Sequence, residues 1–207
     1  MNILVFDTET ISLNKQFIYN LGYVIFDTET GEVHAQRDFV IRQIYDNKPL
    51  FATAYYANKR PLYTARMKGR STQKVSWGEA CRRMAKDIKD YKVADAYAYN
   101  ATFDEKAFYF NHLFFRNKVR PLDRVVVRDI MDYIKPITDT KEYREWTKAH
   151  GFVTAHSTPR PKKTAEAVYA YLKNNPDYKE EHTALKDSEI ELTILVESWK
   201  ANGWRIQ

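Results

Sequence analysis

Short apolar runs separated by polar turns dominate the first forty residues of the chain. Residues 2–6 form an apolar run that ends abruptly in acidic residues, which predicts a short buried strand. Residues 17–27 and 33–41 predict two more strands, and the polar turn at 28–31 between them contains a glycine. We therefore expect these two strands to form an antiparallel hairpin.

Helical periodicity replaces this pattern further along the chain. Residues 76–91 predict a helix, because apolar residues recur at helical spacing and Ser76 with Glu79 forms a capping box at its start. Thr183 is a candidate cap for the last helix, and Gly203 lies past its end. The other predicted elements are a strand at 94–100, a helix at 103–115, a strand at 124–128 and helices near 130–134 and at 164–173.

The order of these elements predicts the fold class. Three strands and a helix, followed by alternating strands and helices, indicate a mixed α/β sheet with helices on its faces. We expect one domain over residues 1–207, in which the polar, proline-containing residues 135–163 form an insertion. In the helix at 103–115, the predicted apolar stripe consists of Phe103, Ala107, Phe110 and Phe114.

The distribution of charge favours a polyanionic partner. The chain has 33 Lys and Arg against 27 Asp and Glu, a net charge of +6. Residues 42–75 form a basic, aromatic-rich region, predicted as loop plus a short helix, in which Asp46 is the only acid. Its cations are Arg42, Lys48, Lys59, Arg60, Arg66, Lys68, Arg70 and Lys74, and its rings are Tyr45, Phe51, Tyr55, Tyr56 and Tyr63. This mixture is typical of single-strand nucleic-acid binders, whereas the alternative is a solvated basic loop with a few rings in the core.

Cysteine content and hydropathy indicate in which cellular compartment the protein is expected. Cys81 is the only cysteine, so no internal disulfide is possible, and it falls on the apolar face of a predicted helix, which indicates a buried filler residue. The first acid, Asp7, comes too early for a signal-peptide core, and no apolar run reaches about 18 residues. We therefore expect a soluble, intracellular, cytoplasmic protein without membrane contact.

Two acidic residues follow the first predicted strand. Asp7 and Glu9 are two positions apart, so their side chains point to the same side of an extended chain. Adjacent carboxylates repel one another unless a cation binds between them, and their hard oxygen atoms suit Mg²⁺ or Mn²⁺. The string Phe-Asp-Thr-Glu-Thr occurs at 6–10 and again at 26–30. The second copy lies in the predicted turn, so we expect no catalytic role for Asp27.

Two further acids stand in contexts that suit a site. Asp104 lies at the start of a predicted helix, just beyond a strand. Taken by itself, it is better explained as an acidic residue that the helix dipole stabilises at the N-terminus. Asp187 comes five residues after His182, and five residues along one helix turn a side chain by about 140°. His182 must therefore lie in the loop before the last helix if both side chains are to reach one point.

Taken in order, these motifs resemble those of the DEDDh exonucleases of the DnaQ-like superfamily, which have an RNase H-like fold. Residues 6–10 are similar to the first motif, 100–104 to the second and 182–187 to the third. Tyr99 stands where many members carry His. No His occurs in residues 50–75, where many relatives have one that touches the substrate.

The resemblance implies a 3′→5′ exonuclease that hydrolyses nucleotides from nucleic acid ends by a two-metal-ion mechanism. The implied catalytic residues are Asp7, Glu9, Asp104, His182 and Asp187. Of these, the four carboxylates bind two Mg²⁺ ions, for which Mn²⁺ can substitute, and His182 is the general base. The implied substrate-binding residues are Thr8, Thr10, Asn100 and Phe103.

The substrate that this resemblance implies is a nucleic acid with a free 3′ end. We expect single-stranded DNA, because the long basic and aromatic stretch suits an extended strand. A polymerase or another replication protein is the expected kind of protein partner. Two alternatives stay open: an RNA-trimming exoribonuclease similar to oligoribonuclease or RNase T, and a non-catalytic nucleic-acid-binding module. The presence of all five catalytic residues favours an enzyme over a binding module.

Overall fold

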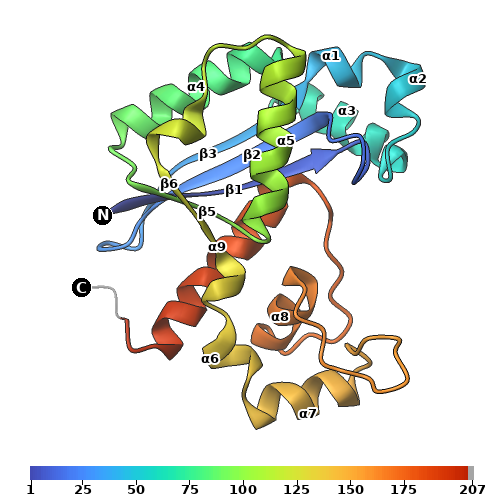
Figure 1. Ribbon diagram of the computed structural model, residues 1–207, viewed down its shortest axis with the longest axis vertical. Coiled ribbons are helices and arrows are strands. Elements are labelled where there is room, and N and C mark those ends of the chain that lie inside the picture. The colour runs from blue at the N-terminus through green and yellow to red at the C-terminus, as the bar shows by residue number, and fades with distance from the viewer. Residues whose placement is uncertain (205–207) are drawn as a thin grey trace.

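A mixed β-sheet forms the centre of the computed structural model, which describes residues 1–204 (Figure 1). The strands are β1 (Asn2–Thr10), β2 (Ile18–Asp27), β3 (Val33–Ile41), β4 (Gln73–Val75), β5 (Asp95–Ala98) and β6 (Val126–Asp129). Their order in the sheet is β4-β3-β2-β1-β5-β6. β2 pairs antiparallel with β1 and β3, whereas β5 is parallel to β1, β6 to β5 and β4 to β3. The expected mixed sheet is therefore confirmed.

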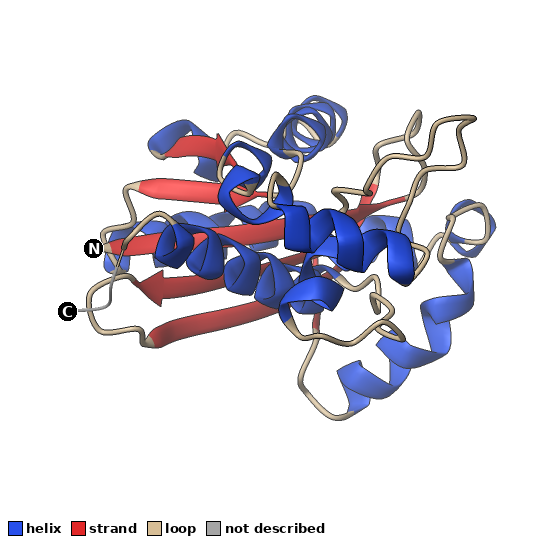
Figure 2. Cartoon of the chain, turned by 90° about the horizontal axis from the view of Figure 1, so that it is seen from below, coloured by secondary structure: helices blue, strands red, loops and turns tan. Residues whose placement is uncertain are grey.

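Helices cover both faces of this sheet (Figure 2). They are α1 (Arg42–Tyr45), α2 (Lys48–Phe51), α3 (Arg60–Lys68), α4 (Trp77–Asp90), α5 (Ala101–Phe114), α6 (Lys135–Thr138), α7 (Lys141–Ala149), α8 (Ala165–Leu172) and α9 (Ala184–Ala201). Leu4 of β1 shares one core with Trp77 of α4 and Phe108 of α5, while its neighbour Ile3 shares the other with Ile190 of α9. None of the helices in residues 1–204 combines the length and hydrophobicity of a membrane-spanning segment.

β1 is longer than the sequence pattern predicts. Asp7 and Glu9 lie within the strand and continue its antiparallel pairing with β2, although β5 pairs with residues 3–5 of β1. The predicted end at Phe6 is wrong, because polar side chains do not interrupt the backbone hydrogen bonds to β2. Since alternate residues of a strand share a face, Asp7 and Glu9 lie on the face of Ile3, toward α9.

The basic segment at 42–75 is more ordered than the predicted loop with a short helix. It contains α1, α2, α3 and β4, and a 3-10 turn at Ala57–Lys59. Tyr45 is buried against Phe51 and Tyr63, and its ring meets theirs edge to face. Hydrophobic periodicity could not reveal α1 and α2, because each helix is a single turn and is too short to show a repeat. These turns are stabilised by packing and not by helix propensity.

The buried face of α5 differs from the predicted aromatic stripe. Phe103 and Phe110 are half-buried, and Phe114 is 59% exposed. The buried side chains of α5 are Ala101, Asp104, Ala107, Phe108, Asn111 and His112. The predicted stripe is thus only partly buried, with Phe110 and Phe114 packed edge to face on Phe17, and the helix also buries polar side chains that hydrophobic periodicity does not register.

The predicted cap of α4 is borne out in the structure, and α8 begins with a cap of the same kind that the sequence pattern had not singled out. The Ser76 side chain accepts a hydrogen bond from Glu79 N at the start of α4, and Cys81 on that helix is buried, as expected. The Thr164 side chain accepts from Ala167 N at the start of α8. Both caps satisfy a free backbone N–H of a first turn, so local sequence defines where these helices begin.

The region from 121 to 163 departs most from the predicted elements. The predicted strand at 124–128 is displaced to β6, and the predicted helix near 130–134 is a 3-10 turn at Ile130–Asp132. The predicted insertion contains α6 and α7, and buried Tyr143 of α7 donates a hydrogen bond to Lys162 O at 2.6 Å. Figure 1 shows α6, α7 and α8 gathered beyond α9, on the side away from α4.

Residues distant in the sequence fix the start of α9. Thr183 precedes the helix, but its side chain makes no cap hydrogen bond, contrary to the prediction, and donates to Glu181 instead. Asn20 of β2 takes that place, since its Oδ1 accepts a hydrogen bond from Ala184 N at 2.8 Å. At the other end, Gly203 follows the helix with a φ of +89°, as expected for a helix stop.

The first turn of α9 packs directly on the backbone of β2 at Gly22. A Cβ atom added to Gly22 would lie 2.0 Å from Leu185 N and 2.2 Å from Ala184 C. Ser188 also donates a hydrogen bond from its hydroxyl to Gly22 O at 3.2 Å. A residue without a side chain is required here, because both opposing atoms belong to the backbone and cannot move independently.

We predict that Gly22→Ala destabilises the protein by about 3 kcal/mol or more, because the first turn of α9 must shift to admit the methyl group. The measurement is the free energy of unfolding in urea. Gly78→Ala is the matched control, because an added Cβ there meets no atom closer than 3.5 Å and the residue lies in α4. The control should be neutral or more stable by up to about 1 kcal/mol. Equal stability of the two variants would contradict the prediction.

Candidate active site

Carboxylates from β1 and α9 meet on one face of the sheet. Glu9 is buried in β1, and Asp187 is buried in the first turn of α9. Glu9, Asp187 and His182 each place one ligand atom within 4.8 Å of the other two. Asp7 is partly exposed, and its charge raises the pKa of both Glu9 and Asp187. Two strand residues and one helix residue therefore share a small volume.

Asp104 approaches this group from α5. It is 2% exposed in the first turn of the helix, and its Oδ1 accepts a hydrogen bond from the Thr8 hydroxyl at 2.6 Å. Thr8 lies between Asp7 and Glu9 in β1, so this bond sets Asp104 beside the strand that carries both acids. Asp7, Glu9, Asp187 and His182 line one small cavity, and Asp104 adjoins it through Thr8.

His182 lies in the loop before α9, where the sequence argument requires it. Its φ of +53° falls in the left-handed region, which residues other than glycine rarely adopt. The imidazole stacks on the ring of Tyr56, with centroids 4.3 Å apart and an interplanar angle of 12°. Its Nδ1 lies 3.7 Å from Glu180 Oε2. Burial and the charge of Lys59 lower the pKa of His182, so the neutral imidazole prevails near neutral pH.

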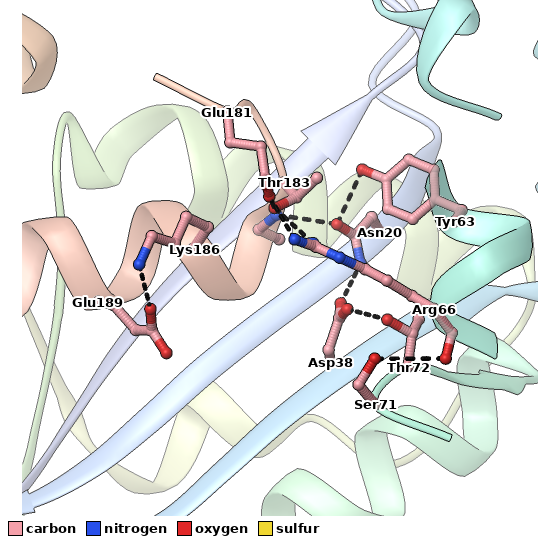
Figure 3. A network of polar contacts seen from close by, with 11 residues as sticks. Asn20, Asp38, Tyr63, Arg66, Ser71, Thr72, Glu181, Thr183, Lys186 and Glu189 are labelled. Atoms are coloured by element: carbon pink, nitrogen blue, oxygen red, sulfur yellow. Dashed lines mark hydrogen bonds and ion pairs between the residues drawn. The ribbon is translucent and has the colours of Figure 1, made fainter. Parts of the chain in front are cut away.

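A polar network holds the loop that carries His182 (Figure 3). Arg66 of α3 donates hydrogen bonds to Glu181 Oε1 at 2.6 Å and to Thr183 Oγ1 at 3.0 Å, on either side of His182. Asn20, which caps α9, also donates to Asp38 Oδ1 at 2.6 Å. The loop is therefore tied both to the basic segment and to the sheet.

A cavity of about 660 Å³ lies beside the carboxylates. Thr8, Thr10 and Phe103, three of the predicted substrate-binding residues, line it together with Tyr55 and Tyr56. The fourth, Asn100, is not part of the cavity wall formed by the described residues. Asn100 has a φ of +61°, and its N–H donates to Asp129 Oδ1 at 3.0 Å, so it shapes the entry into α5.

Sequence reasoning missed two acids at this site. Glu191 is 4% exposed on α9, and its Oε2 accepts a hydrogen bond from Tyr99 N at 3.2 Å. It lies four residues after Asp187, and this helical spacing could have indicated a shared face. Glu180 belongs to a second group, with Glu166 and His182, whose ligand atoms lie within 4.8 Å of one another. Its position in an irregular loop has no sequence pattern that could have revealed it.

Burial and mutual repulsion raise the pKa of the clustered carboxyl groups. For Asp104, burial raises the pKa to about 7. For Asp187, burial first and then the charge of Asp7 raise it to about 8. For Glu180, burial and then Asp187 raise it to about 8. The same two causes, burial before repulsion, hold the pKa values of Asp7 and Glu9 well above their usual range.

The donor set of this cluster fits a divalent cation. Asp187 Oδ1 is buried and, within residues 1–204, has no hydrogen-bond partner. A buried, unsatisfied carboxylate oxygen is unfavourable unless a cation or a proton compensates for it. Carboxylate oxygens are hard ligands, and a bound cation would remove the repulsion among them. Asp7, Glu9 and Asp187, with Asp104 beside Asp7, are the side chains that could hold one.

Several solved structures that are similar in fold to this chain are nucleases. The chain is similar to the nuclease domain of 3′hExo, a DEDDh family member, in a structure bound to rAMP. The two are 14% identical with a TM-score of 0.61, and the similarity covers 100% of this chain and 94% of that one. No protein-family model matches the sequence, and no curated protein matches it.

Two structures of Exonuclease I are also similar to the chain. The enzyme from Methylocaldum szegediense is 17% identical with a TM-score of 0.56, over 95% of this chain and 40% of that one. The Escherichia coli enzyme, in complex with a dA16 oligonucleotide, is 14% identical with a TM-score of 0.55, over 95% and 41%. The chain thus spans about two fifths of the length of Exonuclease I. Together the three structures show that this chain shares the fold of these exonucleases.

We predict that the metal-free protein loses stability as the pH rises from 6.5 to 8. Carboxyl groups with raised folded-state pKa values, such as Asp104 and Asp187, stabilise the fold below their unfolded pKa values. That contribution disappears as the pH passes their folded values of about 7 and about 8. The melting temperature in EDTA should fall by roughly 3–8 °C over this window, because each titrating group contributes up to about 1.4 kcal/mol per pH unit.

Two comparisons test the source of this pH dependence. Excess Mg²⁺ or Mn²⁺ should raise the melting temperature more at pH 8 than at pH 6.5, because protons and cations compete for the same oxygens. Asp187→Asn, which removes one buried charge, should flatten the pH dependence in EDTA. A melting temperature that does not change between pH 6.5 and 8 would contradict the prediction.

Proposed function

We propose that this protein is a metal-dependent 3′→5′ exonuclease that hydrolyses nucleotides from the ends of single-stranded nucleic acid. The observation that carries the proposal is the convergence of Asp7, Glu9, Asp104 and Asp187 with His182 beside a cavity, in a fold shared with exonucleases. The orphaned Asp187 Oδ1 supports a role for a cation in this cluster.

In this proposal the carboxylates bind the metal, and Mg²⁺ is the ion expected, with Mn²⁺ as a substitute. Asp7, Glu9 and Asp187 would hold one ion, and Asp104 together with Asp7 would hold a second. When bound, the ions lower the pKa of a water molecule and stabilise negative charge on the scissile phosphate. Thr8 orients Asp104 through its hydrogen bond of 2.6 Å.

His182 acts as the general base that accepts a proton from the attacking water. It is suited to this role because its lowered pKa keeps the imidazole neutral near neutral pH. It lies close to Glu9 and Asp187, whose ligand atoms are within 4.8 Å of one of its ring nitrogens. Glu180 Oε2 lies 3.7 Å from its Nδ1.

The substrate in this proposal is the 3′ end of a single strand, placed in the cavity lined by Thr8, Thr10 and Phe103. DNA is favoured over RNA because the basic segment at 42–75 suits an extended strand. Tyr55, which is 82% exposed, is available to stack on a base, whereas Tyr45 and Tyr63 are buried in the core. A single domain, a cytoplasmic location and a replication partner stay predictions.

The test of this function is incubation of the purified protein with oligonucleotides of DNA and RNA labelled at the 5′ end. We expect single-nucleotide shortening from the 3′ end that requires Mg²⁺ or Mn²⁺ and stops in EDTA. DNA should be shortened faster than RNA, and the reverse order would identify an exoribonuclease. Binding without shortening in the presence of metal would identify a non-catalytic module and contradict the proposal.

We predict that Asp7→Asn lowers nuclease activity by roughly 10²–10³-fold or more, because it removes a charged metal ligand. The repeated string in the chain supplies a matched control. Asp27→Asn changes the same residue in the second copy, where Asp27 pairs with the amino group of Met1 at the end of β2. This control should keep its activity. A control that is inactive, or an active Asp7→Asn variant, would show that the wrong copy was assigned to the metal site.

We predict that His182→Gln lowers kcat by roughly 10²–10⁴-fold, the usual contribution of a general base. Stabilisation of the variant by Mg²⁺ should persist, because the carboxylate ligands are intact. Thermal melting with and without metal measures that stabilisation, and single-turnover hydrolysis measures the chemical step. Loss of the metal effect together with activity would mean that His182 binds metal instead.

A further inference from the structure

The ring of His182 needs a support that its own loop does not supply. The residue precedes α9, has a φ of +53°, and its side chain is 30% exposed. In residues 1–204 no hydrogen bond to either ring nitrogen is present, and the carboxylate oxygen paired with the ring, Glu180 Oε2, is 3.7 Å from Nδ1, beyond hydrogen-bond distance. A partly exposed imidazole with no hydrogen bond is free to rotate about its side-chain torsions unless something packs on its face.

Tyr56 packs on that face in a nearly parallel arrangement. The ring centroids are 4.3 Å apart, and the planes differ by 12°. Tyr55 meets the Tyr56 ring edge to face, with centroids 4.8 Å apart, and Lys59 Nζ lies over the ring 5.5 Å from its centroid. Tyr56 is therefore enclosed by three side chains, and its ring offers less free surface to a nucleobase than that of Tyr55, which is 82% exposed.

The backbone around Tyr56 ties the ring to the strand that carries Asp7 and Glu9. Tyr55 N donates a hydrogen bond to Ile11 O at 3.2 Å, one residue beyond the end of β1. Lys59 N donates to Tyr56 O at 3.0 Å, which closes the 3-10 turn behind the ring. These bonds fix the position of Tyr56 relative to β1. Because the imidazole of His182 stacks on the Tyr56 ring, its position relative to β1 is fixed as well.

We propose that Tyr56 is a positioning residue, which holds the imidazole of His182 at a fixed orientation over the end of β1 by stacking on it. The inference rests on the proposed function, because it assigns Tyr56 to the same reaction. An aromatic face suits this task, since it packs on a neutral imidazole and also attracts the imidazolium that forms when the base accepts a proton. The basic segment at 42–75 thus supplies part of the catalytic geometry in addition to cations.

The stacking can be tested without metal or substrate, by NMR of the histidine ring protons. The His182 resonances are assigned by their absence in His182→Gln. In the wild-type protein they should be shifted upfield by the Tyr56 ring. Tyr56→Leu should abolish this shift, whereas Tyr56→Phe and the neighbouring Tyr55→Leu should keep it. A His182 resonance that is unaffected by Tyr56→Leu would overturn the proposal.

The positioning role is tested by steady-state and single-turnover kinetics on a single-stranded oligonucleotide with Mg²⁺. Tyr56→Leu should lower kcat by roughly 10–100-fold, because a displacement of about 1 Å of a catalytic group can cost 10²-fold. Its KM should change less than threefold, and Tyr56→Phe should restore kcat, because the ring rather than the hydroxyl makes the contact. Tyr56→Leu in the His182→Gln background should have no further effect on kcat, because the base is already absent.

Three outcomes separate this proposal from the proposed function. A rise in KM with an unchanged kcat in Tyr56→Leu would overturn the positioning role and identify Tyr56 as a substrate-stacking residue. Independent, multiplicative losses in the double variant would also overturn it, because the two side chains would then act separately. A wild-type protein without nuclease activity would overturn the proposed function, and this proposal with it.

Discussion

The chemistry of this protein depends on how closely one helix approaches one strand. α9 can bring Asp187 over β1 only because Gly22 leaves room for the backbone of Leu185 and Ala184. Asn20, two residues earlier on β2, caps the same helix through Ala184 N. The absence of a side chain at Gly22 and the hydrogen bond from Ala184 N to Asn20 therefore fix the position of the helix on β2. The carboxylate cluster forms as a result of that docking.

The cluster opposes the stability of the fold that carries it. Its carboxyl groups have raised pKa values because burial and mutual repulsion disfavour their charged forms. Apolar residues on both faces of the sheet, with Phe6 and Trp77 on one face and Ile3 and Leu195 on the other, offset this cost. The repulsion among the carboxylates lowers the stability of the metal-free protein. A bound cation relieves this repulsion, so the same repulsion raises the affinity of the site for cations.

Much of the fold could be predicted from sequence wherever the signal is local. Ser76 and Thr164 begin helices through hydrogen bonds within one turn, and the alternation of β3 reproduces its observed bounds. The errors arise where distant contacts decide the outcome. Thr183 does not cap α9 because Asn20 does, and the short helices of residues 42–75 exist because their rings are buried against the sheet. No window of neighbouring residues contains that information.

The residues of the candidate site also fall into those that local sequence patterns could indicate and those that they could not. The spacing of Asp7 and Glu9, and of His182 and Asp187, could be interpreted before the structure, because strand and helix geometry determine where such pairs point. Glu180 and Tyr56 could not, since irregular backbone brings them to His182. Asn100 was expected either to contact substrate or to end the strand before α5. Its backbone N–H donates to Asp129 Oδ1 at the start of α5, and contact of its side chain with substrate stays a prediction.

The carboxylates come from β1, α5 and α9, near the beginning, the middle and the end of the described chain. During synthesis on the ribosome, β1 emerges before α9 and presents Asp7 and Glu9 with neither the third ligand nor the imidazole. Docking of α9 at Gly22 is then the last step in assembling the cluster, and it must wait until α9 itself has been translated. Under the proposed function, a nascent polypeptide that lacks α9 is inert toward the messenger RNA beside it, and hydrolytic activity begins only after α9 has docked.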